Sequence, residues 1–199
     1  MKPTYQEARI ELTIHPLTAR RWGDVERLFG LKGACGGCWC MYWRLKRSEF
    51  ETGKGPGNKA RFRKIVTTGP APGLLAYYRN LPVAWCAMGP RADYSTLARS
   101  RVLKPVDDRP VWSIVCFFVS KEHRSKGISV QLLKAAVKQA RKAGAGVLEG
   151  YPVEPSAGQM ADAFAWTGLA SAFRRAGFVE VARRSPTRPI MRYELQSAT

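Results

Sequence analysis

A basic run at residues 123–129 has the residue types and the spacing to bind an anion. It reads His-Arg-Ser-Lys-Gly-Ile-Ser, follows an apolar segment at 111–119, and opens a segment at 129–140 with helical periodicity. A buried strand that passes through a glycine turn into a helix directs unpaired backbone N–H groups and the positive end of the helix dipole at one point. The predicted anion-binding residues are Arg124, Ser125, Lys126, Gly127, Ile128 and Ser129.

Two familiar phosphate-binding patterns are absent from the sequence. A P-loop needs Gly-x-x-x-x-Gly-Lys-Ser/Thr, and a dinucleotide site needs Gly-x-Gly-x-x-Gly after a strand. Instead, Arg124-x-x-Gly127-x-Ser129 resembles the Arg/Gln-x-x-Gly-x-Gly/Ala pyrophosphate motif of the GNAT N-acetyltransferase superfamily, which binds acetyl-CoA. A second short apolar segment at 147–153 after the helix adds to the likeness. An ordinary strand–helix–strand crossover with a basic turn is the alternative.

The resemblance implies direct transfer of an acetyl group from the thioester of acetyl-CoA to an amine. The parallel strands at 111–119 and 147–153 would separate near the turn, and backbone groups of Phe117, Phe118 and Val119 would pair with the pantetheine amides. A free backbone N–H there would stabilise the oxyanion that forms at the thioester carbonyl. The amine must lose a proton to a base, and the thiolate must gain one from an acid.

Three positions that many family members use for proton transfer differ here. Phe173 stands where a Tyr often precedes the Gly-Phe pair by four residues, Trp166 where an Asn is frequent, and Ser113 where some members have a carboxylate. Glu149 is the carboxylate of the second strand, so we rank it first as the base, with a structural ion pair as the alternative. The catalytic candidates are Glu149, Tyr42, Tyr151 and Ser113.

Residues 35–44, Cys-Gly-Gly-Cys-Trp-Cys-Met-Tyr-Trp-Arg, have the most unusual composition. Tetrahedral zinc needs four ligands, but the segment offers three cysteines and both histidines are distant in sequence, so we expect no metal. A thioredoxin-like redox pair is a further alternative. In the resembling family, this segment borders the acceptor pocket. It would also suit core packing or a homodimer interface. The candidate substrate-binding residues are Trp39, Met41, Trp43 and Arg44, beside Tyr42.

Composition and charge limit the possible locations and partners. The 199 residues are 45% hydrophobic, which suits one domain, and no apolar run is long enough to cross a membrane. The N-terminus lacks a signal-peptide pattern and the five cysteines do not suggest disulfides, so we expect a cytoplasmic protein. The net charge of +18 attracts anions. The alternative function is a basic nucleic-acid-binding module with a structural Cys-rich segment, although no named nucleic-acid motif is present.

The order of predicted elements completes the fold expectation. We expect strands at 10–14, 73–78, 83–88, 111–119, 147–153, 178–182 and 190–195. We expect helices at 18–31, 59–68, 129–140 and 168–176 and a surface loop at 90–110. Thr18 and Asn58 would cap the N-termini of the first two helices. The prediction is a single α/β N-acetyltransferase domain (1–199, core about 8–196). Its sheet is GNAT-like, mixed and mostly antiparallel, with one splayed parallel pair and helices on both faces.

Overall fold

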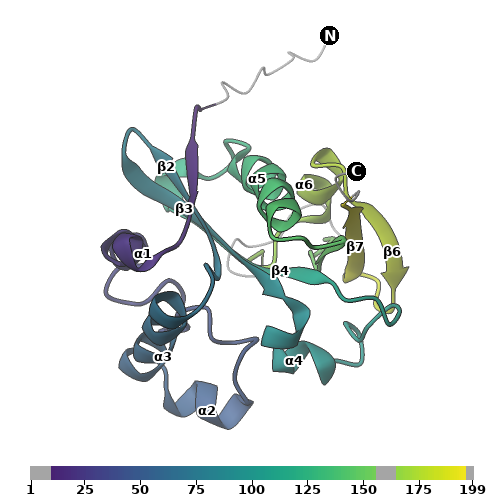
Figure 1. Cartoon of the computed structure of the whole chain (residues 1–199), viewed down its shortest axis with the longest axis horizontal. Coiled ribbons are helices and arrows are strands. Elements are labelled where there is room, and N and C mark those ends of the chain that lie inside the picture. Colours follow the sequence, from purple (N-terminus) through teal and green to yellow (C-terminus); the bar gives the residue numbers. More distant parts are fainter. Residues whose placement is uncertain (1–9, 156–164, 196–199) are drawn as a thin grey trace.

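The computed structural model describes residues 10–155 and 165–195, and within them seven strands form one mixed sheet (Figure 1). The strand order is β1-β2-β3-β4-β5-β7-β6, and neighbours run antiparallel except β4 and β5, which run parallel. The strands are β1 (Thr13–Pro16), β2 (Gly73–Tyr78), β3 (Leu81–Pro90), β4 (Trp112–Val119), β5 (Val147–Gly150), β6 (Val179–Arg183) and β7 (Pro189–Glu194).

Helices cover both faces of the sheet, as the sequence predicts (Figure 1). Side chains of α1 and α3 belong to one apolar core, whereas those of α5 and α6 belong to the core on the other face. The α-helices are α1 (Trp22–Phe29), α2 (Arg47–Thr52), α3 (Pro56–Thr68), α4 (Ser95–Ala98), α5 (Ile128–Lys142) and α6 (Ala170–Arg175). Short 3-10 helices are η1 (Ala19–Arg21), η2 (Arg91–Asp93) and η3 (Lys121–His123).

The β4–η3–α5 unit follows directly from the sequence pattern. The central residues of β4 are buried, which fits an interior strand covered on both faces. Helix α5 buries one stripe of apolar residues with helical spacing against the sheet. The buried residues of α5 are Ile128, Val130, Leu132, Leu133, Ala136, Val137 and Ala140.

Several local expectations are wrong. Thr18 makes no side-chain cap hydrogen bond, and a 3-10 turn precedes α1. Asn58 lies inside α3, which begins at Pro56. Its buried amide instead donates to the carbonyl oxygens of Phe50 and Gly37. The expected strand at 147–153 ends at Gly150, and Val153 then forms an isolated parallel bridge with Leu169.

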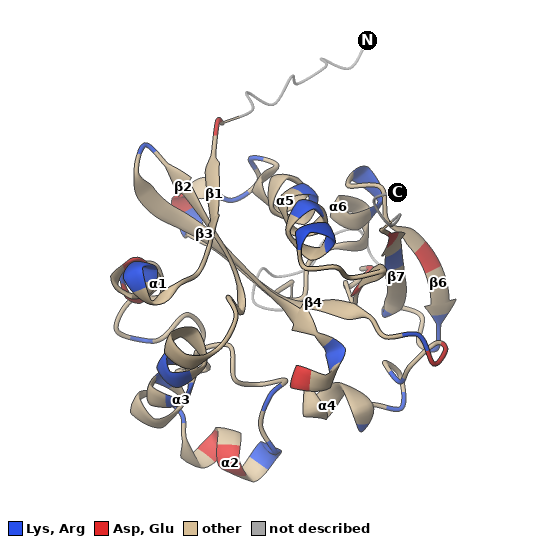
Figure 2. Ribbon diagram, in the orientation of Figure 1, with Lys and Arg blue, Asp and Glu red and all other residues tan. Residues whose placement is uncertain are grey.

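Charged residues are spread over the helices and loops of the molecule (Figure 2). Lys and Arg side chains occur on α1, α3, α5 and α6 rather than on one face of one element. Among the described residues, no helix is long and apolar enough to cross a membrane.

Candidate active site

The turn before α5 has the geometry of an anion-binding site. Gly127 is the N-cap of α5 with φ 70° and ψ 9°, and Ser125 also has a positive φ of 58°. The first bond of the helix runs from the Val130 N–H to the Gly127 carbonyl, so the amides of Ile128 and Ser129 precede the helical ladder. The first turn contains no acidic residue. This cradle (residues 124–129) therefore combines helix-terminal amides with the charges of Arg124 and Lys126.

The parallel strands β4 and β5 pair over three positions and then separate. Trp112, Ser113 and Ile114 face Leu148, Glu149 and Gly150 across the ladder. Beyond this point the ring of Phe173 fills the space beside β5, because a Cβ on Gly150 would lie 2.1 Å from it. Phe173, where the sequence departs from the Tyr that is usual in the resembling family, is fully buried and packs edge-on against Phe117.

Beyond Ile114, a gap separates β4 from β5. The edge of β4 that faces this gap carries three backbone groups with partners inside the protein. We call residues 115–119 the splayed edge. The Trp43 indole N–H donates to the Val115 carbonyl at 3.1 Å, and the Phe117 N–H donates to the Trp166 carbonyl at 2.6 Å. Arg124 Nε donates to the Val119 carbonyl at 3.2 Å, which links this edge to the cradle. Successive strand residues direct their N–H and C=O groups to alternate sides, so Phe118 faces β3 instead.

Three catalytic candidates lie in one buried hydrogen-bond network directly before the splayed edge. Tyr151 donates to Glu149 at 2.6 Å, and its hydroxyl lies 2.8 Å from that of Ser113. Arg91 binds Glu149 Oε1 at 3.2 Å and also contacts the Tyr151 hydroxyl, while Arg192 Nε binds Glu149 Oε2 at 2.7 Å. Only 1% of the Glu149 side chain is exposed, so both of its oxygens serve the network rather than the solvent.

A loop residue, Asp107, extends this network toward the solvent through Arg192. Asp107 binds the Arg192 guanidinium at 2.6 Å, and this hydrogen bond holds the pKa of Asp107 well below its ordinary value. Burial raises the pKa of Tyr151 far above that of a free tyrosine, and the charge of Glu149 adds to the effect. The residues 90–110, expected as a surface loop, therefore contribute ion-pair partners to the buried side chains of Glu149 and Arg192.

Tyr42 has different surroundings from Tyr151. Its side chain is 45% exposed, and its ring packs edge-on against Trp43, Phe50 and Trp166. Trp166 also contacts Trp43, with 5.7 Å between ring centroids. Tyr42 thus has an accessible side chain and belongs to a cluster of aromatic side chains that borders the splayed edge.

The other residues considered for the acceptor pocket separate into two sets. Trp43 reaches the splayed edge, whereas Trp39 and Met41 are buried in the core that contains α1 and α3. Arg44 pairs with Asp93 at 3.4 Å and covers the ring of Tyr94. Trp39, Met41 and Arg44 therefore make their contacts within the folded chain, away from Tyr42.

The cysteines of the Cys-rich segment do not converge on one point. Cys35 is exposed, Cys38 points its thiol toward the Gly33 carbonyl, and Cys40 lies 3.8 Å from the thiol of Cys116. Burial raises the pKa of Cys38 to about 11. Among residues 10–155 and 165–195, no three His, Cys, Asp or Glu side chains form a potential metal site. The absence of zinc stays a prediction, which elemental analysis of the purified protein checks.

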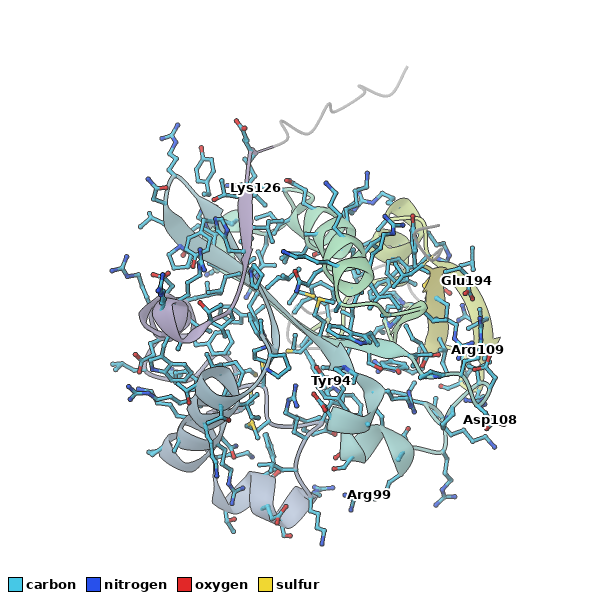
Figure 3. All side chains as sticks on the ribbon, viewed as in Figure 1. Tyr94, Arg99, Asp108, Arg109, Lys126 and Glu194 are labelled. Atoms are coloured by element: carbon cyan, nitrogen blue, oxygen red, sulfur yellow. The ribbon has the colours of Figure 1, made fainter. Side chains whose placement is uncertain are left out.

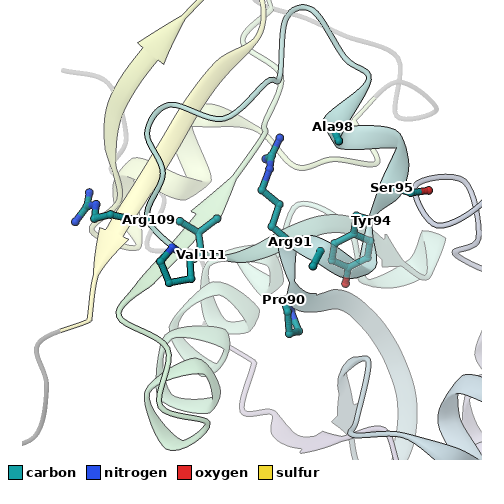
Figure 4. Close-up of a pocket in the computed structure, with 9 residues that line it drawn as sticks. Pro90, Arg91, Tyr94, Ser95, Ala98, Arg109 and Val111 are labelled. Carbon is teal, nitrogen blue, oxygen red and sulfur yellow. The ribbon is translucent and has the colours of Figure 1, made fainter.

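A surface hollow of about 300 Å³ lies elsewhere, over η2, α4 and the residues that precede β4 (Figure 4). Arg91, Tyr94 and Arg109 line it, and Arg109 also pairs with Glu194 at 3.0 Å. Figure 3 shows that Arg109 and Lys126 lie at distant parts of the molecule. The hollow therefore does not belong to the cradle.

Sequence reasoning missed the partners that complete the site. Arg91, Arg192 and Asp107 join the network from distant parts of the chain, and no local pattern marks them. Arg188, in the turn before β7, donates to Thr167 Oγ1 at 3.0 Å beside Trp166. No pattern in the sequence marks Arg188 as a functional residue.

Comparison with known proteins supplies a family and a fold. The model of the acetyltransferase (GNAT) family matches residues 39–164. A GNAT-family acetyltransferase from Listeria monocytogenes has a TM-score of 0.57 at 10% identity, with 96% of this chain and 98% of that one covered. The acetyltransferase of the GNAT family from Streptococcus pneumoniae has a TM-score of 0.52 at 13% identity, covering 94% and 100%.

A third similar structure contains a ligand. It is the paia N-acetyltransferase from Thermoplasma acidophilum in complex with coenzyme A, with a TM-score of 0.51 at 12% identity, covering 93% of this chain and 99% of that one. No curated protein matches the sequence at a significant level.

Proposed function

The chain belongs to the acetyltransferase (GNAT) family, and we propose that this acyltransferase moves an acetyl group from acetyl-CoA directly to a primary amine of a small molecule or a peptide. One observation carries the proposal. A glycine in the left-handed conformation opens α5 shortly after β4, and β4 pairs with β5 only over residues 112–114. Such a site pairs an anion cradle with a strand edge that has lost its neighbouring strand, as a ligand with a pyrophosphate and an amide-containing arm requires.

The residues of the cradle fit the donor. The amides of Ile128 and Ser129 and the charges of Arg124 and Lys126 would hold the pyrophosphate, with Ser125 and Gly127 supplying the left-handed turn. Backbone groups of Phe117 and Val119 face the gap and would bind the pantetheine arm. The coenzyme A in the Thermoplasma acidophilum structure supports this donor. Acetyl-CoA supplies an acetyl group already activated as a thioester.

The acceptor would approach from the aromatic group beside the splayed edge. Tyr42, Trp43 and Trp166 form one wall of this approach. The amine must attack as a neutral base at a carbonyl held near the Phe117 N–H, which would donate to the developing oxyanion. Positioning of the two reactants in the same gap would supply much of the rate enhancement.

Proton transfer divides between exposed and buried groups. We assign Tyr42 as the proton donor to the leaving thiolate, because its hydroxyl is accessible while that of Tyr151 is bound by Glu149 and Ser113. The buried ion pairs of Glu149 favour a positioning role, in which the carboxylate fixes β5, β7 and η2 relative to one another. The amine proton would then leave through water.

An assay of CoA release over a panel of amines tests the proposal. We expect release that depends on the acceptor amine and exceeds the slow hydrolysis of acetyl-CoA alone. A protein that binds no acetyl-CoA and instead binds generic duplex DNA with a steep salt dependence would support the nucleic-acid alternative and reject the acetyltransferase assignment.

A further inference from the structure

Arg188 differs from the other arginines whose side chains lie partly or largely inside the protein. Arg44, Arg91 and Arg192 each bind a carboxylate. Within the part of the chain that the structure describes, half-buried Arg188 forms no ion pair, and its guanidinium donates to the hydroxyl of Thr167 at 3.0 Å. Partial removal of a cation from water without a counter-ion costs free energy, so this guanidinium is a candidate for binding an anion.

The position of Arg188 connects it to the splayed edge. Thr167 is buried and follows Trp166, whose carbonyl accepts the hydrogen bond of the Phe117 N–H. The ring of Trp166 contacts Tyr42. Burial lowers the pKa of Arg188 from the ordinary arginine value, and the nearby Tyr42 opposes this shift. The guanidinium thus lies on the same side of the gap as the proposed acceptor wall.

We propose that Arg188 is the carboxylate-binding residue of the acceptor site, and that the acceptor is an amino acid with an apolar or aromatic side chain. This inference rests on the proposed acetyltransferase function. A guanidinium beside an aromatic wall binds a carboxylate through paired N–H donors while the rings cover an apolar side chain. Arg44, a substrate-binding candidate from the sequence, instead pairs with Asp93.

Matched acceptors and matched variants test Arg188. Phenylalanine and phenethylamine share the ring and the amine, but only phenylalanine has a carboxylate. We expect Arg188→Gln to raise the KM for phenylalanine about 10- to 100-fold, with kcat within about threefold and the KM for phenethylamine unchanged. Arg188→Lys should recover part of the loss, because it keeps the charge without the planar fork. Arg175→Gln removes an exposed charge of α6 and should behave as wild type.

A binding measurement separates the failure of this inference from failure of the proposed function. Calorimetry with the product analogue N-acetylphenylalanine should show affinity lost about 10- to 100-fold in Arg188→Gln, while acetyl-CoA affinity stays constant. Two results for Arg188→Gln would overturn the carboxylate assignment and leave the proposed function intact. One is an equal rise in KM for phenylalanine and phenethylamine. The other is a KM for phenylalanine and an affinity for N-acetylphenylalanine that both stay at the wild-type values. If the wild-type protein binds neither acetyl-CoA nor the analogue, both proposals are wrong.

Discussion

The backbone N–H of Phe117 donates a hydrogen bond to the carbonyl oxygen of Trp166, with 2.6 Å between the two atoms. This bond lies where β4 has lost its β5 partner, and the segment at 165–169 supplies a substitute for the missing strand. The same N–H is the donor that would serve the thioester carbonyl in the proposed reaction. We therefore expect acetyl-CoA binding to exchange this hydrogen bond and to shift Trp166.

Tryptophan fluorescence reports that shift. A titration with acetyl-CoA should change the emission of the wild-type protein, and Trp166→Phe should abolish most of the change while acetyl-CoA still binds. Trp112→Phe is the control, because Trp112 lies on the paired part of β4. A full fluorescence change in Trp166→Phe would show that this segment keeps its position when the coenzyme binds.

Glu149→Gln tests the positioning role of the buried network. The substitution leaves Arg91 and Arg192 without the carboxylate that joins them, so we expect the free energy of unfolding to fall by about 3 kcal/mol. Urea denaturation monitored by circular dichroism measures the loss. A variant with wild-type stability and strongly reduced kcat would instead identify Glu149 as the catalytic base.

Tyr42→Phe and Tyr151→Phe separate the two candidate acids. Removing the exposed Tyr42 hydroxyl should lower kcat about 10- to 100-fold, with little change in stability or acetyl-CoA affinity. Removing the buried Tyr151 hydroxyl should mainly lower stability, by about 1–2 kcal/mol, because Glu149 and Ser113 lose a hydrogen-bond partner. Steady-state kinetics and thermal melts distinguish these outcomes, and size-exclusion profiles show whether Tyr42 instead maintains a dimer. The reverse pattern would transfer the proton-donor role to Tyr151.

The sequence predicts the strand–turn–helix unit because its signals are local. A continuous apolar strand, a glycine and a periodic helix occupy consecutive residues, so the cradle can be placed without knowledge of the rest of the fold. The ion pairs of Glu149 are different, because Arg91 and Arg192 lie 58 and 43 residues away in the chain. Trp39 and Met41 share the apolar pattern of Trp43, and only tertiary packing decides which side chain reaches β4.

The ion pairs of Glu154 predict a stability that depends on pH. Hydrogen bonds from Arg174 and then Arg183 lower the pKa of Glu154 from 4.5 to about 2. The folded state therefore favours the charged form of Glu154. The stabilisation that this charge gives the folded state is complete above pH 4.5 and disappears as the pH falls through about 2. We expect Glu154→Gln to lower the Tm at pH 7 and to match the wild-type Tm near pH 2, provided both remain folded there. A gap in Tm that stays constant between pH 7 and pH 3 would contradict this prediction.

The binding of acetyl-CoA to Gly127→Glu tests the central claim most directly. Gly127 and Gly144 flank the two ends of α5, and both have a left-handed backbone, with φ of 70° and 76°. Glutamate at either position brings the same charge and similar backbone strain, but only at 127 does it enter the cradle. By isothermal titration calorimetry we expect Gly144→Glu to bind acetyl-CoA as wild type does, and a folded Gly127→Glu to lose at least about 100-fold in affinity. Equal affinity in the two folded variants would contradict the assignment of this turn as the coenzyme site.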